Sequence, residues 1–367
     1  MVSHTSPEQL GFDPARLARA RTVLEDHVRT HTTPGAVALV LRRGGVAAHW
    51  AVGRHTYDAT APAVRPDDLY DLASVTKVVV TTTLCMVLEA DGRLDLETPV
   101  SVQIPAFSGE GRDAVTVRRL LTHCGGLPAH RGFYETCRSK ADTVAAVCRT
   151  PLTYQPGTET VYSDLGVILL GALVEHLGGG PLDELARRDV FDPLGMAEST
   201  YCPGEDLKLR IPPTEADKPW RGRLIHGEVH DENAAAMGGV APHAGLFAPA
   251  GDLGRFLRCF LCGGQLEERQ VFPEASVRRF TARANLVPGS TRALGWDTPS
   301  EKGSSAGRYF SSGAFGHTGF TGTSVWADPE RDLGVILLTN RVHPTRENQD
   351  IRKLRPAFHD AVSEALV

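Results

Sequence analysis

The amino-acid sequence predicts an α/β (α+β) fold, in which an antiparallel sheet built from both chain ends is flanked by helices and interrupted by a mostly helical insertion. The first observation is a strand hairpin near the amino terminus, where the apolar runs 36–41 and 46–52 flank a glycine-containing turn. The second is another pair of strands near the carboxy terminus, at 323–327 and 333–339. Between these hairpins, apolar residues recur mostly at helical spacing.

The helices are predicted from apolar periodicity and from the residues that end them. The segment 14–30 carries apolar residues at helical spacing. The segment 74–90 is predicted to be a buried helix although it is rich in β-branched residues. The evidence is Asp91-Gly92, a typical helix C-terminal signal, directly after it. Residues 204–236 are polar and contain prolines, which predicts a long loop over a functional site. Further helices are expected at 115–121, 141–148, 165–176, 182–188, 252–262 and 352–365.

These elements divide the chain into two parts. Residues 1–78 and 237–367 are expected to form the α/β sheet domain, and residues 79–236 the mostly helical insertion with active-site loops. The 367-residue chain is 41% hydrophobic and 23% charged, which is typical of a globular protein with one large unit or two closely joined lobes.

Charge and composition favour a small-molecule substrate. The formal net charge of -5 argues against nucleic acid or an anionic membrane as the main partner. The sequence has neither a basic and then apolar leader nor an apolar run of bilayer length, so we expect a cytoplasmic protein without a membrane partner. The 7 cysteines lack the paired spacing of a zinc site and are expected to be free thiols.

A serine and a lysine three residues apart stand at the start of the helix predicted at 74–90. If Ser74 opens this helix, Lys77 lies one turn further along the same face, where its amine can approach the serine hydroxyl. A hydroxyl needs a base to become a nucleophile at neutral pH, and a lysine provides one when burial or a nearby cation lowers its pKa. The helix amino terminus also favours negative charge near Ser74. This SxxK pattern is short and common, so it needs support from elsewhere.

Two further motifs provide that support. Tyr162 and Asp164, with a serine between them, begin another predicted helix. There a phenol can relay or accept the serine proton, while the serine and the carboxylate can hold the lysine. His317, Thr318 and Gly319 precede the carboxy-terminal hairpin. A glycine-flanked strand edge lets backbone N–H groups approach a substrate closely, as an oxyanion hole requires.

In this order and separation, the three motifs resemble those of the serine β-lactamases and penicillin-binding proteins. Their flanking residues are most similar to those of the class C β-lactamases, the D-alanyl carboxypeptidases and their esterase relatives. The segment 121–128, LTHCGGLP, is similar to a family segment that reads LLTHTSGLP. Other similar segments are 191–196, 238–240, 244–247 and 252–253. The resemblance covers about residues 10–365 and implies a β-lactamase/transpeptidase-like fold.

The resemblance also implies a mechanism. Ser74 would attack a carbonyl while Lys77 and Tyr162 share its proton, and water would then hydrolyse the acyl-enzyme. The backbone N–H groups of Ser74 and Phe320 would form the oxyanion hole, with His317, Thr318 and Gly319 beside the substrate. Such a serine hydrolase needs no metal and no organic cofactor.

Two positions depart from the commonest β-lactamase pattern. Asp164 stands where asparagine is usual, and it either holds Lys77 protonated, which favours Tyr162 as the base, or merely caps a helix or forms a salt bridge. His317 stands where a lysine usually offers a positive charge to a substrate carboxylate, and histidine is largely neutral at pH 7. Weakened carboxylate recognition moves the expected activity toward carboxylic-ester hydrolysis.

Two alternatives to the ester hydrolase stay open. The first is a β-lactamase, or a D-aminoacyl peptidase or amidase acting on wall-derived peptides. The second belongs to another class of protein, a non-catalytic binding protein that has kept the fold. In each case the expected partner is a small molecule, for the enzymes an ester, amide or lactam.

The predicted loop contains a group of histidines and carboxylates whose role the sequence leaves open. His226, Glu228 and His230, with the later His243, could bind zinc if they were helical, but they lie in a loop-like segment and do not form an HExxH motif. His230 or Glu228 could instead border the substrate, or all could be structural. His123 is expected to be a buried, hydrogen-bonded histidine rather than a catalytic one.

Overall fold

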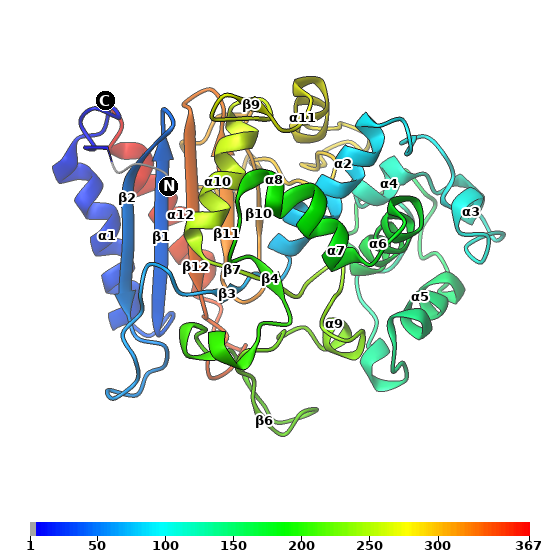
Figure 1. Cartoon of the computed structure of the whole chain (residues 1–367), viewed down its shortest axis with the longest axis horizontal. Helices are drawn as coiled ribbons and strands as arrows, with labels where there is room; N and C mark the ends of the chain where they lie inside the picture. The colour runs from blue at the N-terminus through cyan, green and yellow to red at the C-terminus, as the bar shows by residue number, and fades with distance from the viewer. Residues whose placement is uncertain (1–4) are drawn as a thin grey trace.

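Both ends of the chain contribute strands to one antiparallel sheet, as the sequence predicts (Figure 1). The computed structural model describes residues 5–367; the first four residues of the predicted 1–78 segment lie outside that range. The five strands run in the order β10-β11-β12-β1-β2. Their bounds are β1 (Gly35–Arg42), β2 (Gly45–Gly53), β10 (Phe315–Thr318), β11 (Ser324–Asp328) and β12 (Leu333–Thr339).

The two chain ends meet where β1 pairs with β12, in a register that places Ala36 opposite Thr339 and Arg42 opposite Leu333. Alternate residues of β1 pack on opposite faces of the sheet, because side chains alternate along a strand. Val37 and Leu39 belong to the large core that includes α10 (Ala250–Leu261). The alternate residues Ala36, Ala38 and Val40 belong to the core that includes α1 (Pro14–Arg29) and α12 (Ile351–Glu364). Helices therefore cover both faces of the sheet (Figure 1).

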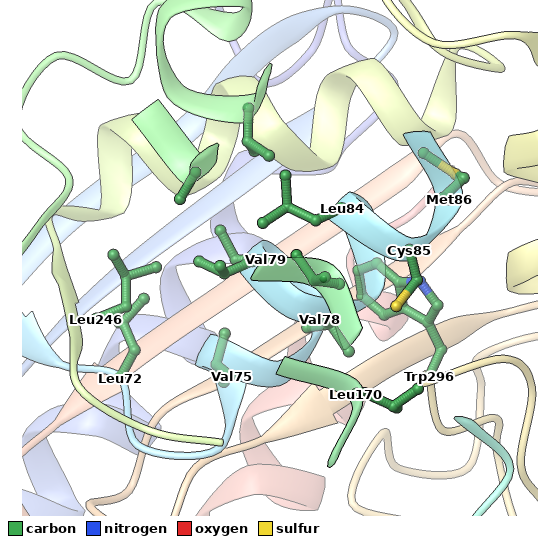
Figure 2. Packing of buried hydrophobic residues seen from close by; sticks show 14 of the residues in the cluster. Leu72, Val75, Val78, Val79, Leu84, Cys85, Met86, Leu170, Leu246 and Trp296 are labelled. Carbon is green, nitrogen blue, oxygen red and sulfur yellow. The ribbon is translucent and has the colours of Figure 1, made fainter. Parts of the chain in front are cut away.

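The larger core extends from the sheet into the helical region (Figure 2). Val75, Val78 and Val79 are fully buried and anchor the turn that contains Ser74 in this core. The helix α6 (Asp164–Gly178) contributes Leu170 to the same cluster. Ser74 and the start of α6 are therefore fixed to one packed body, since close-packed interiors resist displacement.

The structure also contains elements that the sequence did not predict. A three-stranded sheet in the order β3-β7-β4 combines β3 (Tyr70–Asp71), β7 (Leu246–Ala248) and β4 (Thr200–Tyr201). The predicted loop 204–236 contains η5 (Glu205–Arg210), the hairpin of β5 (Ala216–Asp217) and β6 (Arg223–Leu224), and α9 (Glu232–Ala236). The helix predicted from residue 74 begins instead as a π-helix, η1 (Lys77–Thr82), and continues as α2 (Thr83–Ala90), so Ser74 lies in the turn just before it.

The remaining elements surround this framework. The helices are α3 (Val100–Gln103), α4 (Val117–Leu121), α5 (Lys140–Arg149), α7 (Leu182–Ala186), α8 (Asp192–Leu194) and α11 (Glu274–Thr281), with the short helical segments η2 (Arg112–Ala114), η3 (Phe133–Glu135) and η4 (Arg187–Phe191). A last hairpin joins β8 (Gln265–Leu266) to β9 (Arg269–Gln270). Within residues 5–367, no single helix has the length and apolar character needed to cross a bilayer; one pair, α6 with 182–194, reaches them jointly across a 74° bend.

Candidate active site

Ser74 lies in a tight turn between β3 and η1. The residue before it, Ala73, has a φ of 46°, a left-handed conformation that is uncommon for a residue with a side chain. Asp71 stabilises this turn, because its Oδ1 accepts a 2.8 Å hydrogen bond from the Ala73 N–H. The other oxygen of Asp71 accepts a 2.7 Å hydrogen bond from the His230 N–H. The turn that presents Ser74 is thus joined to the predicted loop 204–236.

Lys77 lies one turn after Ser74, and its ammonium group is fully surrounded. Its Nζ is 2.8 Å from Ser74 Oγ, 2.9 Å from the His243 carbonyl oxygen and 2.8 Å from Asp164 Oδ1. These three acceptors match the three N–H bonds of an ammonium group. Burial alone would lower the pKa of Lys77, but the Asp164 carboxylate and Tyr162 together outweigh it, and the pKa is raised above its usual value. Lys77 is therefore positively charged at neutral pH.

Asp164 is the first residue of α6, and Ser163 is its N-cap. Ser163 Oγ accepts from the Gly166 N–H at 3.3 Å and donates to the Pro128 carbonyl oxygen at 2.7 Å, so this serine caps the helix and does not hold the lysine. Asp164 does hold it, and its second oxygen lies 3.6 Å from His130 Nδ1. Burial opposes ionisation of Asp164, yet the Lys77 charge holds its pKa far below the usual range.

Tyr162 lies between two histidines and two cations. Its ring centre is 4.6 Å from that of His123 and 5.8 Å from that of His317. The Lys77 ammonium and the Arg292 guanidinium each lie 5.1 Å from the same ring. The phenol is close enough to Lys77 to raise the pKa of the lysine. Its hydroxyl oxygen is buried and nevertheless has no hydrogen bond of normal geometry within residues 5–367.

The third motif lies on the edge strand β10. Burial, with Arg292 and Lys77 nearby, lowers the pKa of His317 far below its usual value, so the ring is neutral. Its Nδ1 is 2.9 Å from the Thr318 carbonyl oxygen. Gly319 allows a close backbone approach, because a Cβ there would lie 2.4 Å from the Leu72 carbonyl oxygen. The end of β10 therefore packs directly against the segment that leads into Ser74.

Two cavities of about 330 Å³ each meet at Ser74, Tyr162 and Phe320. Phe320 is 47% exposed although it stacks on the buried His230, with ring centres 5.7 Å apart. Within residues 5–367, the backbone N–H groups of Ser74 and Phe320 donate to no other group of the chain. Further residues of the first cavity are Arg292, Asp297, His317, Thr318, Gly319, Arg341, Gln349, Ile351, Arg352 and Arg355. Further residues of the second are Ala73, His130, Asp164, His230, Asp231, Glu232, Ala244 and Arg346.

The histidines and carboxylates of the loop have separate roles. His226 Nε2 lies within hydrogen-bond distance of the Lys208 and Ile211 carbonyl oxygens, at 2.9 and 2.8 Å, and Glu228 pairs with Arg223. Neither of these two lines the cavities at Ser74. His230 lines the second cavity, and its Nε2 is 2.9 Å from Glu215 Oε2. His123 is buried, and its Nδ1 accepts a 3.1 Å hydrogen bond from the Ser163 N–H.

The sequence did not predict several of the charged or titratable residues that border these cavities. His130, Arg292, Arg341 and Arg355 stand in unrelated segments, and isolated arginines and histidines have no local pattern. A signal did exist for His130, which follows two residues after the segment 121–128 that resembles the family.

Comparisons with known proteins place the whole chain in one family. The family model named Beta-lactamase matches residues 20–357. The chain is 34% identical to the N-acetylmuramyl-L-alanine amidase of Bacillus subtilis (strain 168), over 92% of this chain and 83% of that protein. It is 30% identical to a putative D-alanyl-D-alanine carboxypeptidase of Escherichia coli (strain K12), over 94% and 86%. It superposes on EstCE1, a hydrolase with promiscuous acyltransferase activity, with a TM-score of 0.77 and 20% identity, over 95% and 99%. With its fold and its family match in agreement, the chain belongs to the Beta-lactamase family of serine hydrolases.

Proposed function

We propose that this protein hydrolyses an amide bond in small, wall-derived peptides through an acyl-enzyme on Ser74. The observation that carries the proposal is the 2.8 Å contact between Ser74 Oγ and Lys77 Nζ, at a point where two cavities meet. A serine hydroxyl that contacts a cation and opens to a cavity is suited to nucleophilic attack. The N–H groups of Ser74 and Phe320, which have no partner among residues 5–367, are the donors proposed for the oxyanion.

Because Lys77 is charged, Lys77 and Tyr162 have different roles in the proposed mechanism. Asp164 keeps the lysine protonated, so Lys77 cannot accept the serine proton in that state. We assign proton acceptance to Tyr162 acting as a phenolate paired with the Lys77 ammonium: it takes the Ser74 proton and becomes a neutral phenol as the serine oxygen bonds to the substrate carbonyl. The ammonium then balances the negative charge that develops between serine and phenol.

The names of the relatives support amide rather than ester cleavage. One is named an N-acetylmuramyl-L-alanine amidase and the other a putative D-alanyl-D-alanine carboxypeptidase. Both names describe cleavage of an amide bond to the nitrogen of an alanine. We extend this bond type, and no particular substrate, to this chain.

Ester hydrolysis is the second candidate. It is favoured by His317, which is buried and neutral where the resembling β-lactamases have a lysine. A neutral group there offers no charge to a substrate carboxylate. The fold shared with EstCE1 is compatible with ester hydrolysis. It is not evidence for that activity, because the sequence identity is 20% and a shared fold does not imply a shared function.

A substrate panel on one preparation tests the proposal. Acylated alanine dipeptides, nitrophenyl esters of short acids and a chromogenic cephalosporin are compared by kcat/KM for the wild type and for Ser74→Ala. We expect the dipeptides to have the highest kcat/KM and Ser74→Ala to abolish all turnover. Labelling by a fluorophosphonate, located by peptide mass spectrometry, should fall on Ser74. Equal activity in the Ser74→Ala protein would refute the nucleophile, and esters as the best substrates would select the second candidate.

A further inference from the structure

The carboxylates that line the second cavity at Ser74 are each paired with a basic side chain. These pairs are Asp164 with Lys77 at 2.8 Å, Asp231 with His243 at 3.0 Å and Glu232 with Arg346 at 2.6 Å. Burial opposes ionisation of Asp164 and Asp231, but their partners hold both pKa values below the usual range. Carboxylates of this kind are weak bases, so none of them is suited to take a proton from water.

Two histidines line the same cavity, and they differ in what their rings contact. His230 is buried, its Nε2 is 2.9 Å from Glu215, and its ring stacks on Phe320. The side chain of His130 is 50% exposed, and its Nδ1 lies 3.6 Å from Asp164 Oδ2. Within residues 5–367, the His130 ring has no other ion pair or hydrogen bond. Because a carboxylate only accepts, the neutral His130 ring carries its proton on Nδ1 and its lone pair on Nε2.

We infer that His130 is the general base of the second half of the reaction, in which it activates the water that hydrolyses the acyl-enzyme on Ser74. Both residues line the second cavity, so a water molecule between them would lie next to each. The cavity of about 330 Å³ has room for an acyl group and for a water, which takes up roughly 30 Å³. The inference rests on the proposed function and adds a catalytic residue to it.

The charges that face His130 suit it to this role. Asp164, the first residue of α6, raises its pKa, and Asp231 and Glu232 at the start of α9 act in the same direction against burial. Arg346, from the segment before α12, lines the same cavity, but its charge is balanced by its ion pair with Glu232. A general base is most effective when its pKa lies close to the pH of the reaction. A histidine pKa above 6.5 meets that condition near neutral pH.

The proposed hydrolysis balances in atoms and protons. As the water oxygen bonds to the acyl carbon, one water proton passes to His130 Nε2. The bond from this carbon to Ser74 Oγ then breaks, and Oγ takes a proton from the Lys77 ammonium, which lies 2.8 Å away. The carboxylic acid that forms returns a proton to Lys77 and leaves as a carboxylate. His130 releases its proton to solvent, which restores the starting state of the site.

The decay of the acyl-enzyme tests the inference directly. Wild type and His130→Gln are acylated with nitrophenyl acetate, excess ester is removed, and the acetyl group on Ser74 is followed by mass spectrometry. Release of nitrophenolate gives the acylation rate separately. We expect His130→Gln to slow the decay by about 100-fold or more, the range for loss of a general base, and to leave acylation almost unchanged. His176→Gln is the matched control, because His176 is exposed in the last turn of the same helix α6, and it should change neither rate.

Two further measurements distinguish a base from a merely structural residue. The decay rate of the wild-type acyl-enzyme should rise with pH as His130 loses its proton and then level off, whereas the His130→Gln rate should lack this rise. Free imidazole should restore part of the decay in His130→Gln, since a small base can enter the space that the substitution leaves. An acyl-enzyme that decays at the wild-type rate in His130→Gln, or that does not respond to imidazole, would overturn the inference alone. A wild type whose Ser74 is acylated by neither the ester nor an acylated dipeptide would count against the proposed function, and with it this inference.

Discussion

The ammonium of Lys77 and the carboxylate of Asp164 form a 2.8 Å ion pair beside Ser74, with side chains only 2% and 18% exposed. The resembling β-lactamases commonly have a neutral asparagine where this chain has Asp164. The pair sets the protonation of the site, because each charge favours the charged form of the other. Each of the two charges is also the counter-ion of the other, so the loss of either leaves the other charge unpaired.

The first prediction concerns stability. Asp164→Asn should destabilise the protein by about 3–5 kcal/mol at pH 7, because Lys77 then remains buried without its counter-ion. Chemical denaturation measures this change. Asp350→Asn is the matched control, since it breaks an exposed pair with Lys353, and we expect the unfolding midpoint to stay almost unchanged. An Asp164→Asn protein as stable as the wild type would contradict the buried pair.

The same pair predicts how stability depends on pH. The pKa of Asp164 is lower in the folded than in the unfolded chain, so its contribution is present above the unfolded pKa of about 3.9 and is lost as the pH falls through the folded value. The pKa of Lys77 is raised, so its contribution is present below the unfolded pKa of about 10.4 and is lost at higher pH, through the folded value. Denaturation between pH 2 and 11, in roughly one-unit steps, should show the acid loss and the onset of the alkaline loss in the wild type, and both should be smaller in Asp164→Asn.

The second prediction concerns the base. Tyr162→Phe should lower kcat by about 10²–10⁴-fold, because it removes the group proposed to accept the serine proton. In that background, Asp164→Asn should restore part of the activity at alkaline pH, since Lys77 then loses its proton more easily and can act as the base. Profiles of kcat/KM against pH for both single variants and the double variant measure this. A Tyr162→Phe enzyme with wild-type kcat would exclude the assigned role.

The third prediction concerns the close approach at Gly319. Gly319→Ala should lower kcat at least about 100-fold, because its Cβ would meet the Leu72 carbonyl oxygen at 2.4 Å and displace the backbone beside Ser74. Gly251→Ala, in α10, is the control: its Cβ would meet nothing within 4 Å, so activity and stability should be kept. Thermal unfolding of both proteins separates a local effect at the site from a general loss of folding.

Local patterns explain how much of this structure the sequence predicts. The hairpin of β1 and β2 depends on a turn in which Arg43 and Gly44 have positive φ, and such turns are marked by glycine. The contact of Ser74 with Lys77 depends on a spacing of three residues, and it forms although the helix begins in the π form. The sequence does not predict that this helix begins in the π form, because a run of β-branched residues does not distinguish a π-helix from an α-helix.

Contacts between distant segments explain what the sequence does not predict. Tyr162 lines the same cavities as Ser74, and nothing in its own sequence neighbourhood indicates that the two residues lie together. The expected weakness of carboxylate recognition was argued from His317 alone, whose neutral state agrees with the structure. The nearby Arg292 and Arg355 come from other segments and could be related to His317 only once the chain was folded.

The last prediction asks whether a lysine could replace His317. His317→Lys would place a third cation near Lys77 and Arg292, which already lower the pKa of this buried histidine. We expect the variant to be destabilised by about 2–4 kcal/mol, because the new charge is buried without an anion. Arg292→Met in the same chain should recover at least about 1 kcal/mol of that loss, by removing the repulsion. Denaturation of the wild type, both single variants and the double variant gives this coupling energy. Strictly additive effects would show that Arg292 and position 317 do not share one electrostatic environment.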